Sequence, residues 1–191
     1  GDVIDLKNRE DVDTVSEIQD LANAAAAVMN LTKKVNGLTA EQLTNKLGIT
    51  KVTDDNFAAV ARAIANTSPT GSDVDTLENL QKVVDTAVNK AVAALNALQI
   101  FAEANQNSLS ASTTSYIGVK PTWSTLYDAG INSVAGVADS KLADMVADAL
   151  STNAVKAVNV STSALVQGVV NAYGAIAQLA NSQGETPLDA Q

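Results

Sequence analysis

Apolar residues recur along this chain at the spacing of an amphipathic helix, in segments that polar residues and glycines separate. After the polar run 53–56, apolar residues follow the i, i+3, i+4, i+7 pattern of one helix face, at Phe57, Val60, Ala61 and Ile64. A longer stripe follows Asp75 with alternating spacings of three and four residues, at Leu77, Leu80, Val84, Ala87, Ala91, Ala94, Leu98 and Phe101. This stripe predicts a helix of about 30 residues, about 45 Å long at 1.5 Å per residue.

A glycine predicts where the first helix of this series ends. Gly48 follows the apolar segment 38–47 and takes the place at which a left-handed residue closes a helix. Ile49 can then make the hydrophobic contact beyond the turn. The predicted unit therefore has three helices: a short one over 38–47, a second beginning at Phe57 and a long third beginning after Asp75.

The same order of signals occurs more than once, with offsets that drift by a few residues. The matched segments are 11–14 with 73–76 at an offset of 62, 47–50 with 129–132 at 82, and 80–84 with 165–170 at 85 or 86. Thr14 with Glu17, and Asp75 with Glu78, have the spacing of a capping box. Further helices are therefore expected over residues 13–31, 121–129, 142–150 and 162–181.

These repeats predict an all-α fold, made of tandem three-helix bundles that long helices link. Residues 1–36 are expected to be the C-terminal helix of a preceding repeat, 37–108 a three-helix repeat and 109–191 a second three-helix repeat. The Ser- and Thr-rich stretch 105–120 is the expected connection between the two repeats. A third helix of about 30 residues can belong to two units at once and join them stiffly.

His and Cys are both absent from the 191 residues, which narrows the possible chemistry. Without them there is no Ser-His-Asp or Cys-His machinery, no zinc site of the usual nitrogen and sulfur type, and no disulfide. The net charge of −9, without a basic block, argues against nucleic-acid binding, because phosphate contacts dominate that affinity. No run approaches the ~18 apolar residues that a membrane span requires. We expect neither nucleic-acid binding nor a membrane span.

Acidic pairs are the remaining candidates for chemistry. Asp11 with Asp13, and Asp73 with Asp75, have the spacing that can open a calcium loop, but neither continues with the glycine and distal glutamate of a complete loop. Capping of a helix N-terminus explains them better, as it does the pair 54–55, since negative side chains favour that end. We therefore assign no catalytic, cofactor-binding or metal-binding residue and no cofactor, and we expect neither an enzyme nor a small-molecule substrate. Whether calcium binds at the Asp-x-Asp caps stays open.

Two aromatic residues form the other candidate site. Trp123 and Tyr127 lie four residues apart on one predicted short helix. Such a pair can form an exposed binding patch or can plug the end of a small bundle, and the second arrangement is the more frequent one. Met29 and Met145 fall within apolar stripes and are expected to fill the core.

Four segments carry a resemblance to a known family: Gly48-Ile49-Thr50-Lys51-Val52, Asp55-Asn56-Phe57-Ala58-Ala59-Val60, residues 73–85 and residues 126–134. They resemble a helical tandem repeat of giant type I-secreted bacterial surface adhesins, over residues 38–181. The resemblance implies an extracellular location at the bacterial cell surface, an adhesion or biofilm context, and a structural or spacer role. A weaker similarity in helix order is to the albumin-binding three-helix modules of Gram-positive surface proteins.

The function expected from all this is that of a non-catalytic structural or spacer module in a bacterial cell-surface adhesion or biofilm protein. Two alternatives stay open at this point. One is a three-helix module that binds a host or serum protein, and the other is a subunit that assembles with copies of itself into a filament or coat. The expected partners are therefore another protein or copies of this chain.

Overall fold

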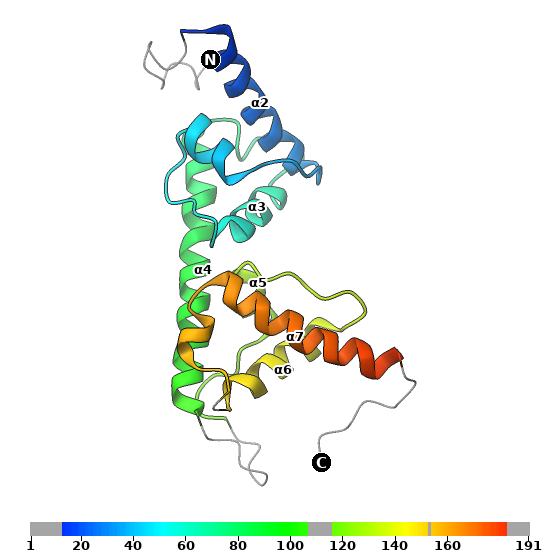
Figure 1. The fold of residues 1–191 in the computed structure, drawn as a ribbon. Helices are drawn as coiled ribbons and strands as arrows, with labels where there is room; N and C mark the ends of the chain where they lie inside the picture. Colours follow the sequence, from blue (N-terminus) through cyan, green and yellow to red (C-terminus); the bar gives the residue numbers. More distant parts are fainter. Residues whose placement is uncertain (1–12, 107–115, 153, 183–191) are drawn as a thin grey trace. The chain divides into compact units, whose positions relative to one another are not determined.

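A computed structural model describes residues 13–106, 116–152 and 154–182, and all regular secondary structure in these ranges is helical (Figure 1). The expected all-α fold is therefore confirmed. The chain divides into two compact units, unit 1 over Gly1–Lys90 and unit 2 over Ala91–Gln191. The boundary between them falls within a single helix.

The described part of unit 1 has four helical segments. They are α2 (Val15–Thr32), the π-helical turn η2 (Gln42–Lys46), α3 (Phe57–Ala65) and the first half of α4 (Leu77–Asn105). The core that they enclose includes Leu21, Val28, Leu43, Ile49, Val60, Ile64, Val74, Leu80 and Val84. The capping box of Thr14 and Glu17 is present at the start of α2, as predicted.

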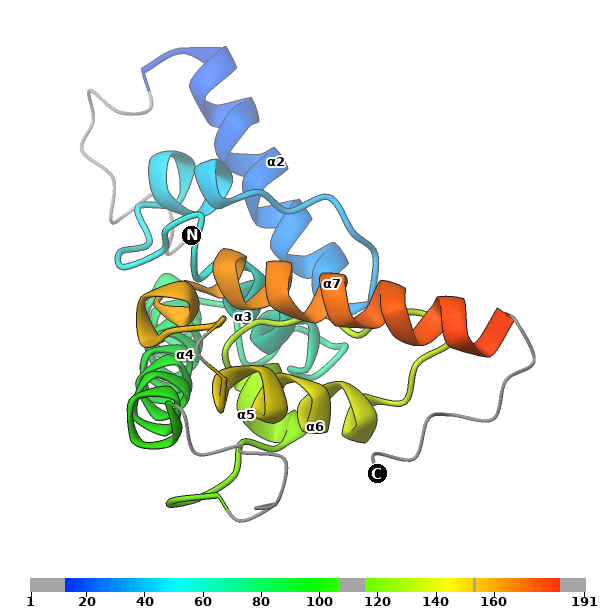
Figure 2. The ribbon, with the colours of Figure 1, turned by 60° about the horizontal axis from the view of Figure 1, so that its bottom comes forward.

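In unit 2, the second half of α4 is followed by α5 (Trp123–Asp128), α6 (Asp139–Leu150), the 3-10 turn η3 (Ala157–Val160) and α7 (Ser163–Ser182). Figure 2 shows the helices α5, α6 and α7 of unit 2 together with α4. Helix α6 packs against both α5 and α7. The core includes Leu98, Phe101, Leu126, Ile131, Val146, Leu150, Val160, Val166 and Val170.

The two cores bury equivalent positions in the same order along the chain. Ala24, Val28 and Leu31 of α2 lie in the core of unit 1, and Ala94, Leu98 and Phe101 of α4 lie in the core of unit 2, each 70 residues later. The later pairs, at offsets of 82 to 86, are Leu43 with Leu126, Ile49 with Ile131, Val60 with Val146, Ile64 with Leu150, Val74 with Val160, Leu80 with Val166 and Val84 with Val170. The two units are thus built on one plan.

Helix α4 belongs to both units. Its residues Leu80 and Val84 are buried in unit 1, whereas Leu98 and Phe101 are buried in unit 2. This explains why the units differ from the expected division into 1–36, 37–108 and 109–191. Helix α2 shares a core with α3, so unit 1 begins before residue 37, and its described part contains four helical segments rather than three. The apolar stripes alone do not say which neighbour covers each of them.

Two local expectations need correction. The cap of α4 is Thr76, whose Oγ1 accepts a hydrogen bond from the backbone N–H of Asn79 at 3.1 Å, rather than a box of Asp75 and Glu78. Glu78 binds Lys82 instead, at 2.6 Å. The expected connection over 105–120 does not separate the two units, because their boundary falls within α4 and this stretch belongs to unit 2. Residues 107–115 lie outside the described ranges.

Candidate functional site

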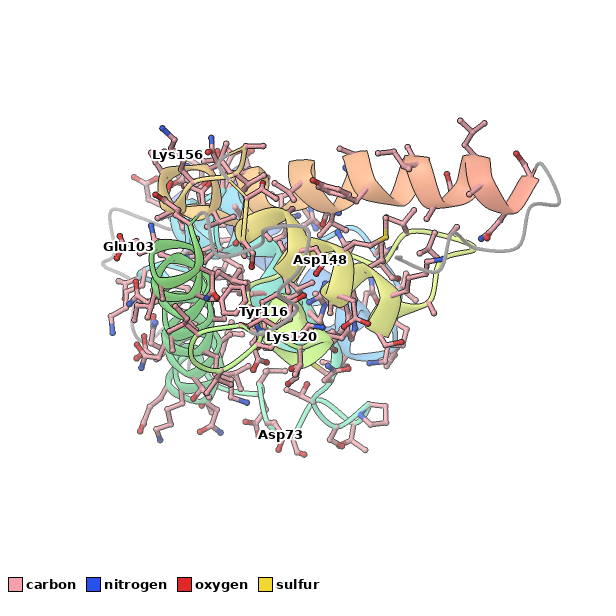
Figure 3. All side chains as sticks on the ribbon, turned by 90° about the horizontal axis from the view of Figure 1, so that it is seen from below. Asp73, Glu103, Tyr116, Lys120, Asp148 and Lys156 are labelled. Carbon is pink, nitrogen blue, oxygen red and sulfur yellow. The ribbon has the colours of Figure 1, made fainter. Side chains whose placement is uncertain are left out.

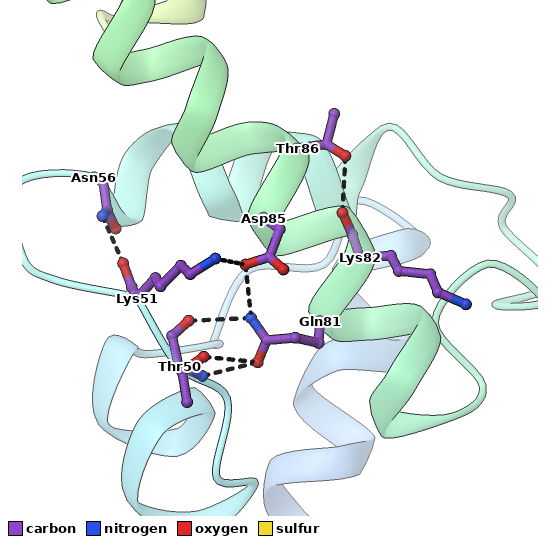
Figure 4. Close-up of polar contacts among 7 residues, drawn as sticks. All are labelled: Thr50, Lys51, Asn56, Gln81, Lys82, Asp85 and Thr86. Carbon is purple, nitrogen blue, oxygen red and sulfur yellow. Dashed lines mark hydrogen bonds and ion pairs between the residues drawn. The ribbon is translucent and has the colours of Figure 1, made fainter.

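The most developed polar arrangement in unit 1 is a glutamine that holds a turn against α4 (Figure 4). The backbone N–H of Thr50 donates to Oε1 of Gln81 at 2.9 Å, and Nε2 of Gln81 donates to the carbonyl oxygen of Thr50 at 3.2 Å. Nε2 of Gln81 also donates to Oδ1 of Asp85, one helical turn further on, at 3.1 Å. We call this arrangement, a glutamine carboxamide bound to both backbone groups of one residue, the glutamine clamp.

The sequence around Gly48 explains how Thr50 reaches α4. Gly48 has a φ of +70°, which an L-residue rarely adopts, and this conformation ends the turn η2. The next residue, Ile49, then donates its N–H to the carbonyl oxygen of Leu43 at 2.9 Å and buries its side chain in the core. The backbone of Thr50 emerges beside Gln81, which follows the buried Leu80 on α4.

Unit 2 contains the same clamp with different residues. The N–H of Asn132 donates to Oε1 of Gln167 at 2.7 Å, and Nε2 of Gln167 donates to the carbonyl oxygen of Asn132 at 3.2 Å. Gln167 also binds Oδ1 of Asn171 at 2.9 Å. The preceding Gly130 has a φ of +87°, and Ile131 is buried as Ile49 is. Two clamps of identical construction therefore hold the two Gly-Ile turns.

The two clamps differ in charge. In unit 1, Nζ of Lys51 lies 3.0 Å from Oδ1 of Asp85, and this bond lowers the pKa of the Asp85 carboxyl. The carbonyl oxygen of Lys51 accepts a hydrogen bond from Nδ2 of Asn56 at 2.8 Å, which ties the turn to the start of α3. Unit 2 has the neutral Ser133 and Asn171 at the corresponding positions. The ion pair is thus an addition of unit 1, while the amide pairing is common to both.

A second carboxamide, Asn105, closes the end of α4 in unit 2. Its side chain is fully buried, and Nδ2 donates to the carbonyl oxygens of Phe101 at 2.9 Å and Ile117 at 2.8 Å. Its Oδ1 accepts the N–H of Ile117 at 2.7 Å. A buried amide is costly unless its groups are paired, so this network specifies how the chain returns to the helix after residue 115.

Tyr116 lies beside this network in a small aromatic and ionic cluster (Figure 3). Its ring centroid is 5.5 Å from that of Phe101, and its hydroxyl donates to Oδ1 of Asp148. Nζ of Lys120 lies 5.1 Å from the centre of the Tyr116 ring and 2.8 Å from Oδ1 of Asp144. Burial, together with the hydrogen bond to Asp148, raises the pKa of Tyr116 well above its ordinary value. The carboxylates here bind groups of their own unit.

The acidic pairs singled out in the sequence occupy turns. Oδ2 of Asp73 accepts the N–H of Ser68 at 2.8 Å, and Oδ1 of Asp75 accepts from Nδ2 of Asn79 at 3.0 Å. Asp54 is exposed in the turn before α3, and Asp11 lies outside the described residues. Within the described ranges, no three acidic side chains gather as a metal site would require.

The two candidate aromatic residues are divided between core and surface. Trp123 is partly buried and packs against the core of unit 2, whereas Tyr127 is 38% exposed. Met29 and Met145 are partly buried and pack against the cores of unit 1 and unit 2, respectively. Trp123 therefore fits the bundle-plug alternative, and Tyr127 does not.

Hollows in the described part of unit 1 include a cavity and a groove. A cavity of about 90 Å³ lies between α2 and the start of α4, and its lining includes Val28, Met29 and Leu80. A shallower groove of about 300 Å³ lies between α3 and α4, and it is lined by Ala63, Lys82, Val83, Thr86, Ala87 and Lys90. Neither lining contains two carboxylates that could work as an acid and a base.

Sequence reasoning aligned Gln81 with Gln167 but gave neither a role. The signal was their common place after an apolar residue in matched repeats, at an offset of 86. The hydrogen bonds between Asn105 and Ile117 had no signal in the sequence.

Among the described residues, no helix combines the length and the apolar character needed to cross a bilayer. No family model matches the chain, and neither a curated protein nor a solved structure matches it.

Proposed function

We propose that this chain is a non-catalytic structural module, a spacer in the extracellular part of a bacterial surface protein that serves adhesion or biofilm formation. The observation that carries the proposal is the sharing of α4 by two units of the same construction. A helix that completes one unit and begins the next is the means by which helical repeats form continuous arrays, in which each unit needs its neighbour.

The polar groups of the described residues support a structural role. Gln81, Gln167 and Asn105 bind backbone groups of turns, and Tyr116 binds a carboxylate of its own unit. Catalytic sites instead need polar groups aimed at a place where a substrate can lie. The resemblance to secreted adhesin repeats supplies the cellular setting of the proposal.

Excision of this module from its parent protein tests the spacer role. We expect surface adhesion to fall when residues 13–182 are removed, and to return when an unrelated folded helical domain of similar length takes their place. Antibodies against the module should label intact cells. Adhesion that returns only with the original sequence would contradict a spacer role, because a spacer depends on length and not on surface identity.

The groove between α3 and α4 favours a second candidate, a module that binds another protein. Its apolar floor of Ala63, Val83 and Ala87, with Lys82 and Lys90 among its lining, fits an acidic amphipathic helix. Calorimetry against serum albumin and other host surface proteins tests this candidate. The binding module is favoured over the spacer role if Val83→Asp abolishes binding and Asn89→Asp, on the exposed side of α4, leaves binding intact.

A further inference from the structure

The first turns of α2 carry the same residue types with which α4 holds a Gly-Ile turn. In the described part of the chain, no Gly-Ile turn lies on these residues of α2. At an offset of 62, Thr14 corresponds to Thr76, Ile18 to Leu80 and Gln19 to Gln81. Oγ1 of Thr14 caps its helix by accepting the N–H of Glu17 at 3.2 Å, as Oγ1 of Thr76 accepts that of Asn79. The starts of α2 and α4 therefore share a threonine cap.

Gln19 makes the side-chain bond to the residue four positions on that accompanies both glutamine clamps. Its Nε2 donates to Oδ1 of Asn23 at 3.0 Å, four residues on, as Gln81 does to Asp85 at 3.1 Å and Gln167 to Asn171 at 2.9 Å. In unit 1 and unit 2 the same carboxamide also binds the backbone of the residue after a Gly-Ile turn. In the described part of the chain, the two Gly-Ile turns lie on Gln81 and Gln167, and no turn lies on Gln19.

The apolar residues next to Gln19 are exposed where their counterparts are buried. Ile18 is 46% exposed, whereas Leu80 is 2% exposed and Val166 is fully buried. Ala22 is exposed at the position of the buried Val84. These residues are separate from the stripe that α2 buries in unit 1, which consists of Leu21, Ala24, Val28 and Leu31.

We propose that the N-terminal half of α2 is a docking surface for one further unit of this same kind. Its Gly-Ile turn would bind Gln19 and cover Ile18, so that α2 serves as its last helix, as α4 does for unit 1. A second copy of the chain cannot supply this turn, because its own two turns are held by Gln81 and Gln167. The inference rests on the repeat architecture invoked in the proposed function and adds the surface through which the array extends.

The spacing of residues along α2 shows which part of this helix the docked unit would contact. Leu80 precedes Ala94 by 94 − 80 = 14 residues, and the corresponding Ile18 precedes Ala24 by 24 − 18 = 6. The two apolar stripes thus follow one another along α4, whereas in α2 they overlap in part. A unit docked on Gln19 therefore shares some turns of α2 with unit 1.

An extended chain tests the proposal. A copy of residues 13–76 is joined to Val15 of the complete chain, because Thr76 precedes α4 as Thr14 precedes α2. We expect the added copy to fold, with the amide of its Thr50 protected from hydrogen exchange to about the extent of the original Thr50. Gln19→Ala at the junction helix should reduce that protection about tenfold, and Ile18→Ala should reduce it further.

Controls separate docking from general effects on α2. Asn30→Ala removes an exposed amide side chain from the same helix and should leave the protection unchanged. In the original chain, Ile18→Ala and Gln19→Ala should leave the melting temperature almost unchanged, because both residues are exposed there.

Three results would overturn the proposal. The first is that the Thr50 amide of the added copy is not protected from exchange, and the second is that Gln19→Ala does not alter its protection. The third is that light scattering shows the original chain to be a dimer and Ile18→Ala to be a monomer. This folding experiment does not involve the cell surface, so it can fail or succeed whatever the adhesion experiment gives.

Discussion

At the scale of single residues, the glutamine clamp is the feature that both units share most closely. A carboxamide offers a donor and an acceptor on one flexible side chain, so it can satisfy both the N–H and the carbonyl of one residue. Those backbone groups belong to Thr50 in unit 1 and Asn132 in unit 2, and each follows a left-handed glycine by two residues. The clamp thus pairs both backbone groups of the residue that follows each Gly-Ile turn.

Removal of the clamp should weaken unit 1 by a measurable amount. Gln81→Ala deletes two hydrogen bonds to the backbone of Thr50, and we expect a loss of about 1–2 kcal/mol in the free energy of unfolding. Urea denaturation followed by circular dichroism measures this loss. Asn89→Ala, an exposed change on the same helix, is the matched control and should have an effect below about 0.5 kcal/mol.

A charged isostere provides a stricter test of the same contact. Gln81→Glu keeps an oxygen that can accept from Thr50, but it cannot donate to the carbonyl oxygen and places a second carboxylate beside Asp85. It should therefore destabilise the chain more than Gln81→Ala does. Equal stability of Gln81→Glu and the original chain would show that the clamp contributes nothing.

At the scale of elements, α4 determines how the two units depend on one another. Leu80 and Val84 complete the core of unit 1, while Leu98 and Phe101 begin the core of unit 2. A helix gains most of its stability from the packing of its apolar faces. Each half of α4 therefore helps to keep the other half helical, and the unfolding of the two units should be coupled.

A proline at the boundary should uncouple them. Lys90→Pro removes one helical hydrogen bond and clashes with the preceding turn, at a cost of about 3 kcal/mol in the interior of a helix. Trp123 is the only tryptophan and lies in unit 2, so its fluorescence reports that unit alone, while circular dichroism reports both. We expect the two signals to change together in the original chain and separately in Lys90→Pro.

The control for this experiment is Lys90→Ala, which removes the same charge and leaves the helix intact. Its two signals should coincide as in the original chain. Coincident transitions in Lys90→Pro would mean that the units do not depend on the continuity of α4.

At the scale of the whole molecule, the absence of histidine shapes the response to pH. No side chain in the sequence has an ordinary pKa between pH 6 and 8, since only histidine titrates there when unperturbed. Acid should act through carboxyls instead. The pKa of Asp85 is lowered by its bond to Lys51, and that of Glu78 by its bond to Lys82.

The direction of the acid response follows from these shifts. A carboxyl whose pKa is lower in the folded state stabilises the fold above its unfolded pKa, about 4, and this contribution disappears as the pH falls through the folded value. We expect the melting temperature to be flat from about pH 6 to pH 8 and to fall below about pH 4. Both pairs are exposed, so the contribution of each is small.

Lys51→Met isolates one of these contributions. It removes the partner of Asp85 and should make the fall below about pH 4 shallower, while the midpoint near neutral pH changes little. Thermal denaturation at a series of pH values, with salt held constant, measures both. A midpoint that varies between pH 6 and 8 would contradict the assignment of the pH response to carboxyls.

The helices and their ends follow from local pattern in the sequence. The stripe from Leu77 to Phe101 predicted a long helix, and Gly48 predicted the turn that ends the first short helical segment. The box of Thr14 and Glu17 was also predictable, because its two partners lie three residues apart. Amphipathic period, capping and left-handed glycine act over a few residues, so one sequence suffices to recognise them.

Tertiary packing decided which segments share a core and what the amide side chains bind. Gln81 and Thr50 are 31 residues apart, and Gln167 and Asn132 are 35 apart, so no local rule pairs them. The apolar stripe of α2 likewise predicts a buried face without naming the α3 and α4 residues that cover it. Periodicity reports which side of a helix avoids water, whereas the identity of its neighbour depends on how distant helices pack together.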